Sequence, residues 1–323
     1  MRPFAAPLTP LVASLVASLL AAPDPSHPTA EGFQEGRTAG VRLMHSAIVL
    51  SGNGLGGKGA KGDGYRIPRP CWYEPYKSAE EMLREEDSTL QHAFRADPDL
   101  SSSSSNSRQY TNDFLQQYRD KLGQQGRWWR AAYNAGDQNG AACSAALATA
   151  VWVPTGTTPP GGITAEELRA IARAALTVPE PQVKLSPDAK SYVNLPTWVW
   201  LEGGAQVPRS VTATLPGFMS VTVTATPKNV EIDPGTTSDR AEVRENCGAG
   251  GRPYTKGGDF TCGVRYLRAS IDQSRDVYTL TVTSVWQVVS TDDQGGQPFP
   301  FEPIRAAATR DVPVGEVQSV VTG

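Results

Sequence analysis

The residue pattern that first suggests chemistry is GNGLGGKG at Gly52–Gly59. A GxxxxGK loop followed by Ser or Thr cradles phosphates in nucleotide-binding proteins, and a helix must begin directly after it. Here Gly59 stands where the hydroxyl residue is needed, and Ala60–Pro70 contains two more glycines and two prolines. We therefore interpret this stretch as linker, and nucleotide binding through Gly52–Gly59 is a remote alternative function.

Histidine is scarce in this chain. The three histidines are His27, His45 and His92, so none follows residue 92. Because imidazole is the only side chain that titrates near neutral pH unperturbed, catalysis by a Ser-His-Asp or Cys-His arrangement is not expected. A histidine metal cluster is not expected either. The sequence assigns no catalytic, cofactor-binding or metal-ligating residue, and we expect no cofactor.

Carboxylates are plentiful, with 33 Asp and Glu residues against 30 Lys and Arg. A pair of carboxylates can hydrolyse glycosides without a histidine. No spacing marks a particular pair, and acidic turns such as Asp292-Asp293 are usually solvated. A secreted hydrolase that acts through a carboxylate pair is therefore the main alternative function. The mixed charges and the net charge of -3 argue against nucleic acid as a partner.

The chain begins with a pattern typical of a secretory signal peptide. Arg2 precedes an apolar run at Leu11–Ala22, and small residues come before Pro23. Twelve apolar residues are too few to span a bilayer, so we expect export, removal of residues 1–22 and no transmembrane span afterwards. The expected location is secreted or on the outer side of the cell envelope.

Four cysteines follow the predicted signal: Cys71, Cys143, Cys247 and Cys262. In an exported chain an even set predicts two disulfides, and four cysteines allow three connectivities. Pairing neighbours in sequence would keep one bridge in each expected domain. A zinc site made from all four thiolates ranks below this because no CxxC spacing occurs.

The aromatic residues give the only positive hint of a binding site. Trp198 and Trp200 share one face of a predicted strand, and Val199 and Leu201 share the other. Paired exposed tryptophans would form a stacking platform for sugars or for a protein partner. The favoured interpretation is instead that they fill the core together with Trp286, because tryptophan buries a large area.

Helical patterns lie in the first half of the chain. We predict helices over Ser78–Arg95, where Ser78 and Glu81 form a capping box, and over Tyr110–Leu122, after a flexible serine tract at Leu100–Ser107. A further helix over Ile163–Leu176 begins at Thr164 and carries an apolar stripe suited to core packing. Before these, residues 23–64 are expected to be a disordered Gly/Pro-rich linker.

From Tyr192 onwards the hydrophobic period changes to two. Strand-like runs follow one another with Pro, Gly, Asp and Asn turns between them, and Thr alternates with Val as expected for one buried and one wet face. The predicted strands are Arg209–Leu215, Phe218–Thr226, Val230–Asp233, Val264–Ile271 and Val277–Ser290.

Part of this region resembles immunoglobulin-like sandwiches of the PKD type. The resemblance rests on Asn229–Gly235, Tyr266 and the strand Tyr278–Trp286, although Asp233-Pro234-Gly235 replaces the usual Gly-Asp-Gly turn.

The chain also resembles a family of secreted actinobacterial proteins of unknown function, over Leu168–Gly323 and more loosely over Cys71–Pro160. That family has no catalytic residues to carry over to this chain. The motifs that carry the likeness are Val193–Trp200, VTVTATP, Cys247, Pro253-Tyr254, Cys262–Tyr266, Trp286 and Val314–Gln318.

These patterns predict an α+β protein with a small helical N-terminal region and a C-terminal antiparallel β-sandwich of the PKD/Ig-like kind. The expected divisions are 65–160 (α-rich, with Cys71 and Cys143), 161–191 (helix and linker) and 192–323 (sandwich). The leading hypothesis is a non-catalytic module for adhesion or assembly. Its expected partner is a cell-wall glycan or another envelope protein.

Overall fold

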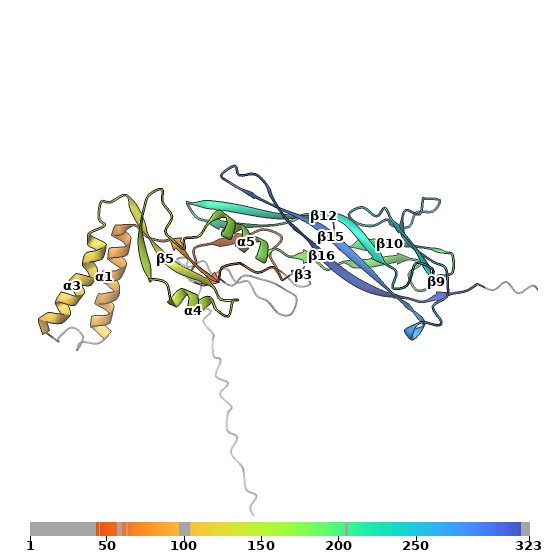
Figure 1. Cartoon of the computed structure of the whole chain (residues 1–323), viewed down its shortest axis with the longest axis horizontal. Coiled ribbons are helices and arrows are strands. Elements are labelled where there is room, and N and C mark those ends of the chain that lie inside the picture. Colours follow the sequence, from red (N-terminus) through yellow and green to blue (C-terminus); the bar gives the residue numbers. More distant parts are fainter. Residues whose placement is uncertain are drawn as a thin grey trace, which may run out of the picture.

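The structure, a computed structural model, describes residues 43–44, 46–56, 60–62, 64–96, 104–203 and 206–317. The predicted signal peptide, His27 and His45 lie outside these residues. In the described chain the fold is mostly β, and its sheets are antiparallel apart from one short pairing. The molecule is elongated, with a helical hairpin at one end and layered strands at the other (Figure 1).

A five-stranded antiparallel sheet forms the centre of the molecule, in the order β16-β15-β12-β11-β2. Three of its strands hold 14 or 15 residues and run through most of the molecule (Figure 1). The strands are β2 (Val49–Ser51), β11 (Arg209–Leu215), β12 (Met219–Asp233), β15 (Tyr278–Asp292) and β16 (Phe299–Val312).

The long strands bury one face along their whole length. On β15 the even-numbered residues from Tyr278 to Ser290 are buried, while Thr279 and Thr291 are exposed on the other face. The pairing register shifts between Pro227 and Asn229 and again beside Trp286, which keeps the apolar residues of all three strands on this face. The predicted alternation of buried Val and wetter Thr is confirmed.

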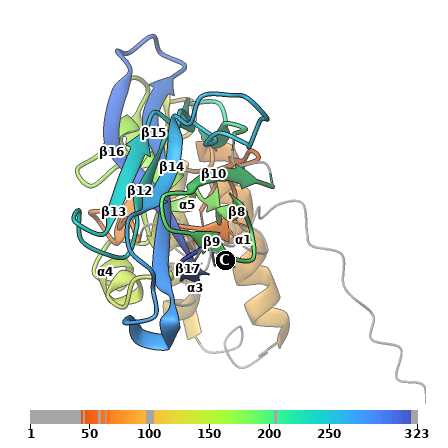
Figure 2. The same cartoon turned by 90° about the vertical axis from the view of Figure 1, so that its right-hand side faces the viewer.

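A second antiparallel sheet, ordered β13-β14-β10-β8, covers one half of this face. Its strands are β8 (Gln182–Ser186), β10 (Pro196–Glu202), β13 (Ala241–Glu245) and β14 (Cys262–Tyr266). Two short strands, β9 (Ser191–Tyr192) and β17 (Val314–Gly315), pair in parallel beside it, and a 3-10 turn, η1 (Ser274–Asp276), precedes β15. Figure 2 views the molecule from this end.

Helix α5 (Ala165–Ala175) and a third sheet cover the other half. Thr164 caps α5, because its hydroxyl accepts from the Glu167 backbone while the Glu167 carboxylate accepts from the Thr164 N–H. The predicted helix and its buried apolar stripe are confirmed. The third sheet comprises β1 (Leu43–Met44), β4 (Cys71–Pro75), β5 (Gly126–Asn134) and β6 (Ala150–Pro154).

The described chain therefore has two main cores on the same long strands. The first core joins α5 and the third sheet to Val211, Val223 and Trp286. The second joins Val199 and Val264 of the covering sheet to Val230, Leu280 and Val282 of the long strands. A short pairing of β3 (Ala60–Lys61) with β7 (Val178–Pro179) lies at the margin of the first core.

The remaining helices are α1 (Ala79–Ala96), α3 (Ser104–Arg119) and α4 (Gly140–Ala145). The predicted capping box on α1 is confirmed: the Glu81 N–H donates to the Ser78 hydroxyl, and the Ser78 N–H donates to the Glu81 carboxylate. Helix α3 begins earlier than predicted and includes Ser104–Ser107, so the flexible break expected there is wrong for these four residues.

Four further expectations differ from the structure. The linker expected at residues 23–64 contains β2 and β3, and Ile48 is fully buried, so part of this stretch belongs to the fold. The two strands predicted between Phe218 and Asp233 are one strand, β12, and the strand predicted at Val264–Ile271 ends at Tyr266. The helical region at 65–160 also contains a sheet, in which Trp128 and Trp129 lie on β5.

Both disulfides join neighbours in sequence, Cys71 to Cys143 and Cys247 to Cys262, and no described cysteine is free. The expectation of two bridges is therefore confirmed, and the structure selects one of the three connectivities. The first bridge ties β4 to α4, and the second closes the loop between β13 and β14.

Candidate binding face

The two tryptophans proposed from the sequence lie on the outer face of the covering sheet. Val199 and Leu201 of β10 point into the second core, so Trp198 and Trp200 must point away from it. Trp286 is buried in the first core instead. The favoured expectation that all three tryptophans share one core is therefore wrong.

A loop folds over these tryptophans and adds two more rings. The loop runs from Cys247 to Cys262, and the ring centroids of Tyr254 and Phe260 lie 5.8 Å and 5.6 Å from that of Trp198. Both contacts are edge-to-face, an arrangement that favours aromatic pairs beyond the area they bury. We call Trp198, Trp200, Tyr254 and Phe260 the aromatic face.

Two glycines allow the loop to lie close to β10. Gly251 pairs with Trp200, and a Cβ atom at Gly251 would lie 2.5 Å from the Trp200 Cα atom. Gly263 sits beneath the Phe260 ring, where a Cβ atom would lie 2.8 Å from Phe260 Cε2. Both have positive φ values, which glycine adopts without strain. The disulfide and these close approaches hold the aromatic face in place.

The four rings differ in exposure. Trp198 is 7% exposed beneath its neighbours, Tyr254 is 54% exposed, and Trp200 and Phe260 are intermediate. The surface available to a ligand is therefore mainly the Tyr254 ring, with the partly exposed Trp200 and Phe260 on the same face of the covering sheet. It is not the pair of exposed tryptophans that the sequence suggested.

Charged side chains surround the aromatic face. Lys184 pairs with Glu202 at 3.6 Å, and Glu242 lies 3.5 Å from Arg265 and 3.9 Å from Arg244. The Arg265 guanidinium also lies 6.0 Å from the centroid of Phe260. An exposed ring bordered by donors and acceptors can stack on one face of a sugar and bond its hydroxyl groups.

The other residues weighed from the sequence do not form a second site. His92 is exposed on α1, as expected for a solvated helix residue. In the Gly52–Gly59 stretch, Gly54 bonds Ser210 and Thr177, and the segment that follows forms strand β3 instead of the helix a phosphate loop needs. Residues 57–59 lie outside the described chain. No group of three or more His, Cys, Asp or Glu residues suited to a metal occurs within the described ranges.

Glu74 is a fully buried carboxylate. Because solvent does not reach it, it is not accessible to a substrate. Glu74 on β4 accepts hydrogen bonds from the Ser46 hydroxyl, the Ala47 backbone and the Trp72 indole, at 2.6, 2.6 and 2.7 Å. Burial raises the pKa of Glu74, and the hydrogen bonds oppose that rise. Because all its partners belong to the fold, Glu74 anchors residues 46–48 to β4.

Only part of the aromatic face could be predicted from the residue pattern. It marked Trp198 and Trp200 but not Tyr254 or Phe260, which lie more than fifty residues further along the chain. The spacing of Cys247 and Cys262 was the available signal. A disulfide between these residues closes the loop that contains Tyr254 and Phe260 and keeps both ends of the loop at the sheet.

Comparison with known proteins adds no relative: no protein-family model, curated protein or solved structure matches this chain. Among the described helices none has the length and apolar character needed to cross a membrane.

Proposed function

We propose that the chain is a non-catalytic, extracellular adhesion module that binds a cell-wall glycan through its aromatic face, and that its C-terminal half is an Ig-like sandwich of the PKD type. The observation that carries the binding proposal is Tyr254. This ring is more than half exposed, rests on Trp198 and belongs to a loop closed by a disulfide. A fixed, exposed ring binds at low entropic cost.

The strand order supports the Ig-like assignment. In the constant-type immunoglobulin sandwich, strands A to G form one sheet ABED and another CFG. Naming β8, β10, β12, β13, β14, β15 and β16 as A to G gives D-E-B-A in the covering sheet and G-F-C in the central sheet. The two sheets face each other through the second core.

A tyrosine at the start of strand F gives further support. The Tyr278 hydroxyl lies 3.1 Å from the carbonyl oxygens of both Arg268 and Ala269, in the corner before β15. Immunoglobulin sandwiches have a tyrosine at this corner whose hydroxyl bonds to the upstream backbone. The Tyr278 ring stacks on Tyr266 at 4.6 Å, which links the two sheets.

Two features depart from the usual pattern. The Cys247–Cys262 bridge closes a loop within one sheet, whereas antibody domains join strands B and F across the core. At the turn after β12, Gly235 has a φ of 71° and donates to Asp233, so Asp-Pro-Gly makes a tight turn where PKD domains have Gly-Asp-Gly. Neither feature disturbs the strand order.

Export and an extracellular location are part of the proposal. Disulfides persist in oxidising compartments, and both bridges here join residues that the fold places side by side. The Glu202 and Glu242 carboxylates beside the aromatic face lie 3.6 Å from Lys184 and 3.5 Å from Arg265, so donors and acceptors for a polar ligand border the ring.

The test is co-sedimentation of the purified chain with insoluble peptidoglycan, comparing wild type with Tyr254→Ala. We expect Tyr254→Ala to weaken binding by roughly tenfold, as loss of an aromatic contact at an interface does. Ile271→Ala is the matched control, because Ile271 is an 80% exposed apolar residue of the same half that lies outside the aromatic face.

Equal binding by Tyr254→Ala and wild type would contradict the proposal, as would no sedimentation of the wild-type chain. The supernatant also tests the alternative function. Soluble sugar fragments released by the wild-type chain would favour the hydrolase hypothesis instead.

A further inference from the structure

The loop that folds over the aromatic face carries two cations beside its exposed ring. Arg252 and Lys256 lie two residues before and two residues after Tyr254, and both are exposed. Neither side chain forms an ion pair with another residue that the structure describes. A negatively charged ligand can therefore reach both cations without displacing a partner that belongs to the fold.

The backbone holds both cations beside the exposed ring. The Arg252 N–H donates to the Val199 carbonyl oxygen at 2.9 Å, and Pro253 restricts Arg252 to an extended conformation. A turn over Thr255–Gly258 is closed by a 3.0 Å hydrogen bond from the N–H of its last residue to the carbonyl oxygen of its first. Lys256 is the second residue of this turn. The two cations are therefore held at their backbone on either side of the ring.

The four strands of the covering sheet and this loop together have a small excess of positive charge. Their cations are Lys184, Arg244, Arg252, Lys256 and Arg265, and their carboxylates are Glu202, Glu242, Glu245 and Asp259. Glu202 faces Lys184, and Glu242 is shared by two arginines. Glu245 and Asp259 are exposed and do not pair with either loop cation. This part of the molecule is therefore positive, whereas the whole chain has a net charge of -3.

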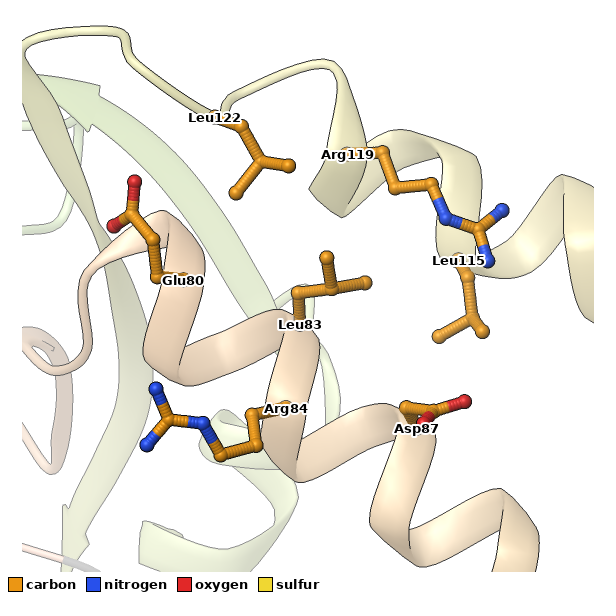
Figure 3. Close-up of a pocket in the computed structure, with 7 residues that line it drawn as sticks. All are labelled: Glu80, Leu83, Arg84, Asp87, Leu115, Arg119 and Leu122. Atoms are coloured by element: carbon orange, nitrogen blue, oxygen red, sulfur yellow. The ribbon is translucent and has the colours of Figure 1, made fainter.

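The pocket between helices α1 and α3 lacks this combination of features. It lies at the end of the molecule opposite β10 (Figure 1). Figure 3 shows Glu80, Arg84, Asp87 and Arg119 around it, which are two charges of each sign. No aromatic ring is among the described residues that line this pocket. The aromatic face is therefore the better of the two places for a ligand that carries both a sugar ring and a negative charge.

We propose that the glycan bound by the aromatic face is acidic. One sugar ring stacks on Tyr254, and a carboxylate or phosphate group on a neighbouring unit pairs with Arg252 and Lys256. A guanidinium binds such oxyanions through two parallel hydrogen bonds, and an ammonium binds them as a point charge. This inference rests on the proposed function, because it names the class of glycan that the same site takes.

The test is co-sedimentation with insoluble peptidoglycan, comparing wild type with Arg252→Gln/Lys256→Gln. We expect the variant to bind roughly fivefold more weakly, because it loses two solvent-exposed ion pairs with the glycan. In about 1 M salt the Debye length falls to roughly 3 Å, so wild-type binding should fall to the level of the variant. Arg84→Gln/Arg119→Gln is the matched control, because it removes two positive charges at the opposite end of the molecule and should bind like wild type.

Two treatments of the peptidoglycan distinguish the sources of the negative charge. Carbodiimide with ethanolamine converts carboxylates into neutral amides, and hydrofluoric acid removes polymers attached through phosphodiesters. If the first treatment abolishes the difference between wild type and Arg252→Gln/Lys256→Gln, the bound group is a carboxylate. If the second abolishes it, the bound group is a phosphate. A difference that survives both treatments would overturn the proposal.

Tyr254→Ala, measured in the same assay, separates failure of this inference from failure of the proposed function. If Tyr254→Ala binds more weakly while Arg252→Gln/Lys256→Gln binds like wild type, the site takes a neutral glycan and only this inference is overturned. If Tyr254→Ala binds like wild type, or wild type does not sediment, the proposed function fails and the inference fails with it. Equal losses from the loop variant and from Arg84→Gln/Arg119→Gln would reveal a general effect of charge and would also overturn the inference.

Discussion

The two halves of the central sheet use the same three strands but bury them in different ways. Over Met219–Pro227 the inner face of β12 is covered by a helix and by a sheet from the first half of the chain. Over Asn229–Asp233 the same strand is covered by a second sheet of the C-terminal half. The first half of the sheet face is therefore covered by residues that are distant in sequence, and the second half is covered by residues that are closer in sequence.

This difference bears on how the molecule holds together. Ile48, Trp72 and Leu168 are buried in the first core, so that half cannot form without segments that precede β12 by fifty residues or more. The second core takes all of its residues from Val183 onwards. Because β12, β15 and β16 are continuous through both, loss of packing in one core should be transmitted to the other.

The largest expected effect tests this coupling at the place where the cores meet. Trp286 is fully buried in the first core, beside the register shift that separates the halves. We expect Trp286→Ala to lower the free energy of unfolding by about 3–5 kcal/mol, measured by denaturant titration. If the long strands couple the halves, hydrogen exchange should accelerate in both of them.

Val282→Ala is the matched control on the same strand, because Val282 is buried in the second core only. We expect Val282→Ala to lower the free energy of unfolding by about 2 kcal/mol. If Trp286→Ala accelerated exchange in the first half alone, the halves would be independent units, and coupling through shared strands would be refuted.

The two disulfides allow a smaller comparison, because each lies in one half. The Cys71–Cys143 loop spans 72 residues and the Cys247–Cys262 loop spans 15. We expect removal of the first bridge to cost about 4 kcal/mol and of the second about 3 kcal/mol, since longer loops gain more chain entropy when opened. Thermal unfolding of the paired Cys→Ala variants measures both, and a larger loss from the shorter loop would contradict this order.

The two halves also differ in how far the sequence predicts them. In the C-terminal half, period-two alternation located β11, β12 and β15, because these strands bury one face and wet the other. It missed β16, whose Pro300 and Pro303 argue against a strand. Prolines are tolerated there because β16 is the edge of the sheet.

In the N-terminal half, helices were predictable from capping boxes at Ser78 and Thr164, whereas strands were not. All five residues of β4 are buried, so the strand has no alternation to detect. Strand β2 has three residues and pairs with β11, about 160 residues away, in a stretch whose glycines suggest a linker. Tyr254 could not be assigned to the aromatic face for a similar reason, since tertiary contacts across the covering sheet place it there.

The smallest expected effect compares two hydrogen-bonding residues, one in each half, that hold a chain segment in place. Tyr278 holds the corner before β15, and Glu74 holds residues 46–48 against β4. The Glu74 carboxyl is titratable, and burial raises its pKa above the ordinary value of 4.5. The folded state therefore binds a proton that the unfolded state has released, over the interval between the two pKa values.

The sign of the pH dependence follows from this. The stability linked to protonated Glu74 is fully present below about pH 4.5 and is lost as the pH rises through the raised pKa of the folded state. Glu74→Gln keeps the shape and cannot ionise, so wild type should lose stability relative to this variant as pH rises through the raised pKa of Glu74. Denaturant titrations of both proteins from pH 4 to pH 8 measure the difference. A difference that stays constant, or that moves in favour of wild type at high pH, would mean that the three donors around Glu74 outweigh its burial.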